Sequence, residues 1–271
     1  MILAAIDAVD WSRIPPASGP SEAGGRSAPL TPDGLRDLYE PARVAAGLRA
    51  LATATGLVRA ADAGSHLAGG GLLHDHSGTV FPAAVTAAPF LLAIMRDGHP
   101  HAAATALGLL YDALTFSVGD DGRTRVATPY ADAVPICCAL ADHLRGEADL
   151  LAASGAEGRW LLADAAHHWR FDVREVAADG EGVLALGAFA GRFPGGTRPA
   201  EAYRVGRAAP LLVQAVSPYP LGEDGSDACL RIDGVQPDEL APPTVLLPAR
   251  GSHPAATDTA TDTATDTDAA A

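Results

Sequence analysis

The chain has 271 residues, 48% of them hydrophobic, and its formal net charge at pH 7 is −14. This length and apolar fraction allow one sizeable domain with a real core. All 19 basic residues are arginine, which excludes chemistry that needs a lysine, such as Schiff-base formation or a P-loop. The acidic balance, without a cluster of arginines, argues against a nucleic-acid partner.

Targeting and membrane signals are also missing from the sequence. No apolar run reaches the ~18 residues of a membrane span, and the longest, residues 83–95, is too short. The first residues, MILAAIDAVDWSR, lack the basic region that opens a signal peptide. We therefore expect a cytoplasmic protein without membrane contact.

The first part of the chain contains short apolar segments separated by a long polar one. The spacing of the apolar side chains allows either a short first helix or an extended cap within residues 1–14. Proline, glycine and serine dominate residues 15–34, which predicts a flexible loop. Helices are expected over residues 35–52 and 60–67.

The most informative stretch, residues 72–116, predicts two apolar helices joined by a tight turn. The first helix covers residues 83–95 and is apolar nearly all round, as in a buried helix. Its internal Pro89 predicts a kink. The second helix begins at Pro100 and ends near residue 115. Such a hairpin cannot bury its apolar faces alone and must pack on other elements.

The segments that follow are less regular. Residues 117–128 predict a polar loop, and residues 129–144 predict a helix with an internal proline, Pro135. Another helix is expected over residues 157–169, with His167 and His168 at its end, one half-buried against a tryptophan and one in solvent.

Residues 171–193 allow two interpretations. A β-hairpin would turn at Asp179 and Gly180, whereas the spacing of apolar residues also fits a helix over residues 173–190. Gly180 and Gly182 count against the helix, but we favour it because another helix precedes it at the right distance. A further helix is expected over residues 199–216.

The C-terminal region is harder to interpret. The sequence leaves residues 217–250, rich in proline and glycine, without a clear assignment. From residue 251 onward, repeats of alanine, threonine and aspartate predict a disordered tail.

The chain resembles bacterial HEAT-repeat proteins. The resemblance is carried by Asp10, Trp11 and Ser12 near the start and by the segment HSGTVFPAAVTAAPFL at residues 76–91. It implies a mainly α fold, a short irregular α-solenoid, with a small β-containing element within residues 171–193 or 217–250. The expected organisation is an N-terminal segment, a HEAT-like domain and a disordered tail, covering residues 1–34, 35–250 and 251–271.

The densest group of titratable residues lies at the start of the central hairpin. His74 and His76 would point the same way in an extended segment, as two metal ligands do, with a third from Asp97, His99 or His101. The other interpretations are a polar turn that caps the next helix and a contact with a partner. We predict no metal and no catalytic residue, and the predicted binding residues are His74, Asp75, His76, Thr79, Phe81, His99 and His101.

Three cysteines are present: Cys137, Cys138 and Cys229. Adjacent cysteines seldom form a disulfide, and an odd total argues against a disulfide framework. The apolar surroundings of Cys137 and Cys138 predict buried thiols that pack in a core.

These patterns, together with the resemblance, predict a protein that binds another protein and needs no cofactor. Whether the chain is an enzyme is left undecided, although no catalytic constellation is evident. One alternative is an accessory enzyme or maturation factor that handles a small molecule with His74 and His76. Another is an immunity-type protein that binds a basic toxin, since the chain itself is acidic.

Overall fold

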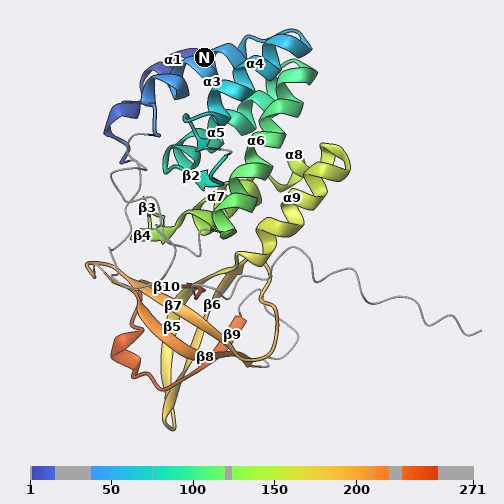
Figure 1. Cartoon of the computed structure of the whole chain (residues 1–271). Helices are drawn as coiled ribbons and strands as arrows, with labels where there is room; N and C mark the ends of the chain where they lie inside the picture. The colour runs from blue at the N-terminus through green and yellow to red at the C-terminus, as the bar shows by residue number, and fades with distance from the viewer. Residues whose placement is uncertain are drawn as a thin grey trace, which may run out of the picture.

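The computed structural model describes residues 2–15, 38–74, 76–119, 124–207, 209–219 and 228–249. An N-terminal group of helices packs on a C-terminal β-barrel, with a short β-hairpin between them (Figure 1). Most of the predicted N-terminal loop and the whole of the predicted C-terminal tail fall outside the described residues, as does Asp75.

The helical part contains two pairs of antiparallel helices and a third group. The N-terminal elements are α1 (Ile2–Asp7), the 3-10 helix η1 (Trp11–Arg13), α3 (Pro41–Ala52) and α4 (Leu57–Ala68). The central hairpin consists of α5 (Ala83–Asp97) and α6 (Pro100–Gly119), preceded by the short strands β1 (Leu73–His74) and β2 (Thr79–Val80). The third group is α7 (Ile136–Gly146), α8 (Ala148–Ala153) and α9 (Gly155–His167).

The central hairpin agrees with the sequence prediction because its ends carry strong local signals. Pro82 precedes α5, Gly98 is its C-cap, and Pro100 begins α6. Eight side chains of α5 are buried, which explains why this helix is apolar on nearly every face.

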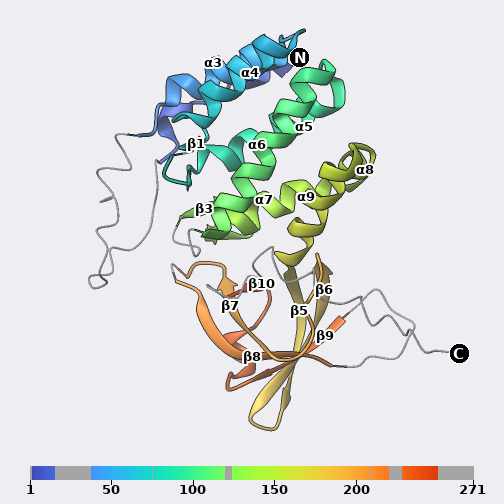
Figure 2. The same cartoon turned by 45° about the vertical axis from the view of Figure 1, so that its right-hand side comes forward.

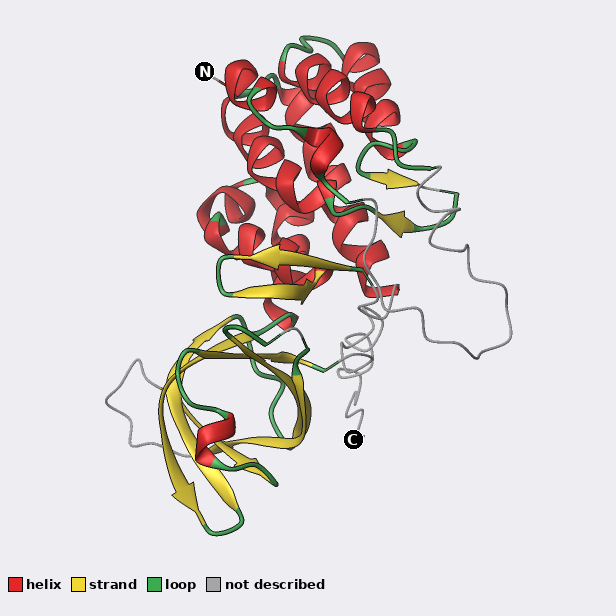
Figure 3. Ribbon diagram, turned by 90° about the vertical axis from the view of Figure 1, so that its left-hand side faces the viewer, coloured by secondary structure: helices red, strands yellow, loops and turns green. Residues whose placement is uncertain are grey.

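The C-terminal part is a closed barrel of six antiparallel strands in the order β10-β5-β6-β9-β8-β7 (Figure 3). A separate 3-10 helix, η2 (Pro237–Glu239), lies between the last two strands in the chain. The barrel strands are β5 (Arg170–Asp179), β6 (Gly182–Ala190), β7 (Arg198–Arg204), β8 (Leu211–Tyr219), β9 (Ala228–Asp233) and β10 (Thr244–Pro248).

The barrel has its own apolar core, separate from that of the helices. Side chains at alternate positions point inward, among them Phe171 and Val173 on β5 and Val183 and Ala185 on β6, all of them buried. Trp169 closes one end against Phe189 and Phe193. The interior is therefore filled by side chains.

The barrel corrects the predicted fold class. The chain is not a mainly α solenoid, so the predicted HEAT-repeat architecture is wrong. Residues 173–190, which we favoured as a helix, belong to the β5–β6 hairpin, and the helix expected over residues 199–216 is replaced by β7 and the start of β8. Gly180 has a φ of +63° at the hairpin turn, a conformation that favours glycine over other residues.

The helix predicted over residues 129–144 is also corrected. Residues 125–135 form a second hairpin, β3 (Arg125–Thr128) and β4 (Ala131–Pro135), and α7 begins only at Ile136. Pro135 therefore ends a strand and precedes a helix, which suits a residue that has no backbone N–H.

The two parts are joined by a direct connection from helix to strand. Helix α9 leads directly into strand β5 (Figure 2). Only His168 and Trp169 separate the two elements, and both residues are buried. Among the described residues, no helix is both long enough and apolar enough to cross a membrane.

Candidate functional site

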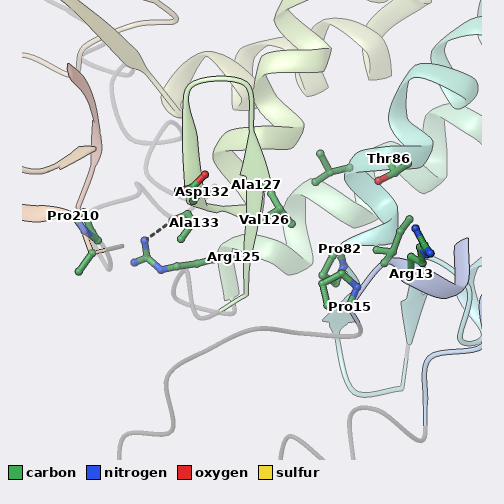
Figure 4. A pocket seen from close by; sticks show the side chains of 13 residues that line it. Arg13, Pro15, Pro82, Thr86, Arg125, Val126, Ala127, Asp132, Ala133 and Pro210 are labelled. Carbon is green, nitrogen blue, oxygen red and sulfur yellow. Dashed lines mark hydrogen bonds between the residues drawn. The ribbon is translucent and has the colours of Figure 1, made fainter. Parts of the chain in front are cut away.

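A cleft of about 740 Å³ lies between the helical part and the barrel (Figure 4). Its walls come from the segment after η1, the start of α5, the β3–β4 hairpin and the loop between β7 and β8. The lining is mostly apolar, with Ile14, Pro82, Val85 and Pro210 among its residues. This size and position are typical of binding sites, which often form where two parts of a chain meet.

Strand β3 borders the cleft with its backbone as well as its side chains. Three consecutive residues, Arg125, Val126 and Ala127, line the cavity. Because successive side chains of a strand point to opposite faces, a cavity that meets three in a row also meets the main chain. Within the described ranges, β3 pairs with β4 alone, so its other edge carries no strand.

The charged groups of the cleft leave an excess carboxylate. Arg13 pairs with Asp10 at 3.3 Å, and Arg125 pairs with Glu201 at 3.0 Å. Asp132 on β4 also lines the cleft, it is exposed, and no basic side chain of the described part of the chain pairs with it. The cleft therefore favours a ligand with a positive charge near Asp132.

A buried cluster behind the cleft fixes the hairpin to the barrel. Both terminal nitrogens of Arg125 donate to the carboxylate of Glu201 on β7, at 3.0 and 3.2 Å. Arg125 also donates to the Ala133 carbonyl at 3.1 Å and to the Tyr203 hydroxyl at 2.5 Å, and that hydroxyl donates to Glu201. Burial and the nearby carboxylate raise the pKa of Tyr203 well above its usual value, so the phenol remains a donor.

A second cluster joins α7 to the first strand of the barrel. The carboxylate of Asp142 accepts hydrogen bonds from Tyr130 at 2.7 Å, from Arg170 at 2.8 Å and from Arg145. Arg145 also donates to the carbonyl of His168 at 2.6 Å. These two clusters hold the helical part, the hairpin and the barrel in a fixed arrangement, so the cleft between them is largely preformed.

The structure places the predicted binding residues in a different region. His74 and Ser77 are hydrogen bonded at 2.8 Å in the turn between β1 and β2, and the His74 and His76 ring centres are 5.9 Å apart. Ser77 also bonds Thr79. Phe81 is fully buried in the helical core, where its ring contacts Tyr39.

His99 and His101 form a second pair before and within the first turn of α6, with ring centres 5.2 Å apart. Within the described residues, which do not include Asp75, these histidines do not bring three metal-ligating atoms together.

A different group has that property. Atoms of Cys137, Cys138 and His168, one from each residue, all lie within 4.8 Å of one another. None of the three cysteines forms a disulfide and all three are buried, as the sequence predicted for Cys137 and Cys138.

The residues of the cleft were missed by sequence reasoning. Arg125, Val126 and Ala127 fell in a predicted loop, and Asp132 in a predicted helix. The only local signal is for the β3–β4 hairpin that carries these residues: Pro129 and Tyr130 lie between two short apolar segments, and Pro135 forms a break before α7.

Comparison of the chain with protein-family models, with curated proteins and with solved structures gave no match. The site is therefore interpreted from its geometry alone.

Proposed function

We propose that this protein is a binding protein and that its partner is another polypeptide, held in the cleft as an extended, apolar and basic segment. The observation that carries the proposal is that β3 lines a mostly apolar cleft of about 740 Å³ and, among the described residues, has a strand on only one of its two edges. An extended peptide can add a strand to such an edge, with main-chain hydrogen bonds for affinity and pockets for alternate side chains.

The lining supports apolar side chains in the bound segment. Pro82 from the helical part lies on one side of the cleft and Pro210 from the barrel on another (Figure 4), and Val85 also lines it. These walls are anchored by the Arg125 and Asp142 clusters, so binding would require little rearrangement, which lowers its entropic cost.

The charges support a basic segment. Arg125 is neutralised by Glu201 and Arg13 forms an exposed ion pair with Asp10, whereas no basic side chain of the described residues pairs with Asp132. The net charge of −14 adds long-range attraction for a basic partner. A basic toxin, one of the alternatives that the sequence raised, would have this chemistry.

Selection from a library of short linear peptides, followed by fluorescence anisotropy on the selected sequences, tests the proposal. Ala127→Trp should fill the cleft and weaken binding at least about tenfold, which corresponds to ~1.4 kcal/mol. The matched control is Val58→Trp on α4, where the side chain is 81% exposed and away from the cleft. Equal binding by the two variants would contradict the proposed site.

Two further comparisons test the mode of binding. Methylation of alternate backbone nitrogens of the peptide should abolish binding, because it removes the main-chain donors that pair with β3. Asp132→Asn should weaken the binding of a peptide with a basic residue but leave unchanged the binding of its neutral analogue. A peptide indifferent to both changes would not be bound as an added strand.

A further inference from the structure

Two cysteines and a histidine meet at the junction of the helical part and the barrel. Cys137 and Cys138 lie in the first turn of α7, and His168 is the C-cap of α9, two residues before the first barrel strand begins. The three residues are 1%, 1% and 3% exposed. The packing of α7 against α9 therefore brings together residues that are thirty positions apart in the chain.

The distances suit a shared metal ion. The candidate ligand atoms lie within 4.8 Å of one another. In zinc sites, metal–sulfur bonds of ~2.3 Å and metal–nitrogen bonds of ~2.0 Å place the ligating atoms less than ~4 Å from one another. Small side-chain rotations would close that difference, with no movement of the helices.

The ligand types select the class of ion. Thiolate sulfur and imidazole nitrogen are the ligands of soft or borderline cations, in particular Cu⁺ and Zn²⁺. Two thiolates neutralise Zn²⁺, and with Cu⁺ they leave one negative charge near Arg145, which lies two turns further on α7. In either case the buried charge is largely compensated, as a site in a protein interior requires.

We propose that Cys137, Cys138 and His168 bind one thiophilic metal ion, Cu⁺ or Zn²⁺, which links the start of α7 to the segment that leads into the barrel. Three protein ligands complete the trigonal coordination that Cu⁺ accepts, whereas Zn²⁺ would need a fourth ligand. The site is structural, since its ligands are buried, and it is independent of the cleft.

Metal binding by the full-length chain tests this proposal. The protein, free of any histidine tag, is unfolded with a chelator, refolded, and dialysed separately against Zn²⁺ and against Cu⁺ under reducing conditions. Elemental analysis should show one ion per chain in at least one arm, and the arm that binds identifies the ion. With Zn²⁺, replacement by Co²⁺ should give a sulfur-to-cobalt charge-transfer band.

Variants then assign the ligands. Cys138→Ser should lower the affinity at least ~100-fold, since loss of even an outer-shell partner costs 10–100-fold in metal sites. The control is Cys229→Ser, which removes a barrel thiol outside the group and should leave the affinity unchanged. The metal should raise the melting temperature of the wild type and of Cys229→Ser but not of Cys138→Ser.

Two results would overturn the proposal. One is a wild-type protein that binds neither ion stoichiometrically, a measurement that does not depend on the folding of any variant. The other is a folded Cys138→Ser variant that binds the metal as tightly as Cys229→Ser does.

Discussion

Arg125→Met should be the most informative test of how the two parts of the chain are held together. Arg125 and Glu201 are 15% and 9% exposed, and the substitution leaves the Glu201 carboxylate buried with the Tyr203 hydroxyl as its remaining partner in the cluster. Removal of one member of a buried ion pair typically costs 3–5 kcal/mol. Because some exposure remains, we expect a loss of about 3 kcal/mol in the free energy of unfolding.

Urea unfolding, followed by circular dichroism, measures this loss as a shift in the midpoint of about 1 M or more. The matched control is Arg231→Met, which breaks a pair with Asp179 whose members are 42% and 35% exposed. The change also removes the exposed pair of Arg231 with Asp233, but exposed pairs contribute little to stability, so the control should be nearly neutral.

A double variant, Arg125→Met with Glu201→Leu, should recover most of the lost stability, because no buried charge is left without its partner. If Arg125→Met costs no more than Arg231→Met, the buried cluster does not hold the hairpin to the barrel and this reasoning is refuted.

Two further predictions concern stability. Burial lowers the pKa of His143 below 6.5, against the opposing effect of Asp142, so the unfolded chain binds the proton more readily than the folded chain. The free energy of unfolding should therefore fall as pH drops through 6.5. In denaturant titrations at acidic pH, His143→Gln should lose less of this free energy than the wild type does. Gly187→Ala would place a Cβ 2.1 Å from the Asp172 carbonyl oxygen and should lower the free energy of unfolding by about 2–3 kcal/mol. Gly108→Ala would place its Cβ in open space, with no atom within 4 Å, and should raise the free energy of unfolding by up to about 1 kcal/mol through helix propensity. Melting temperatures that move equally in the two glycine variants would contradict the packing of β5 against β6.

The central helical hairpin was predictable because its boundaries are local. Pro82, Gly98 and Pro100 act through their own backbone chemistry, and no distant contact is needed to place the ends of α5 and α6. The periodicity of buried side chains then identified the helices themselves.

The barrel was not predictable on the same grounds. A six-stranded barrel has a narrow interior, so small residues such as Ala185, Ala200 and Ala202 fill it. Alanine is the strongest helix former and is depleted in strands, so tertiary packing overrode local propensity here.

The cleft could not be found from the sequence, because four separate segments build it. Asp132 carries no local signal, and Arg125 gains its role only from Glu201, 76 positions later in the chain. The group of Cys137, Cys138 and His168 could not be predicted either, because these residues become neighbours only after α7 and α9 pack together.

Backbone hydrogen exchange at β3, with and without a selected peptide, tests the proposed function most directly. An added strand should slow the exchange of amides within Arg125–Thr128, since their exposed edge would gain hydrogen-bond partners. The amides of α4, which lies outside the cleft, should be unaffected. Unchanged exchange at β3, with protection elsewhere on the molecule, would contradict the proposal.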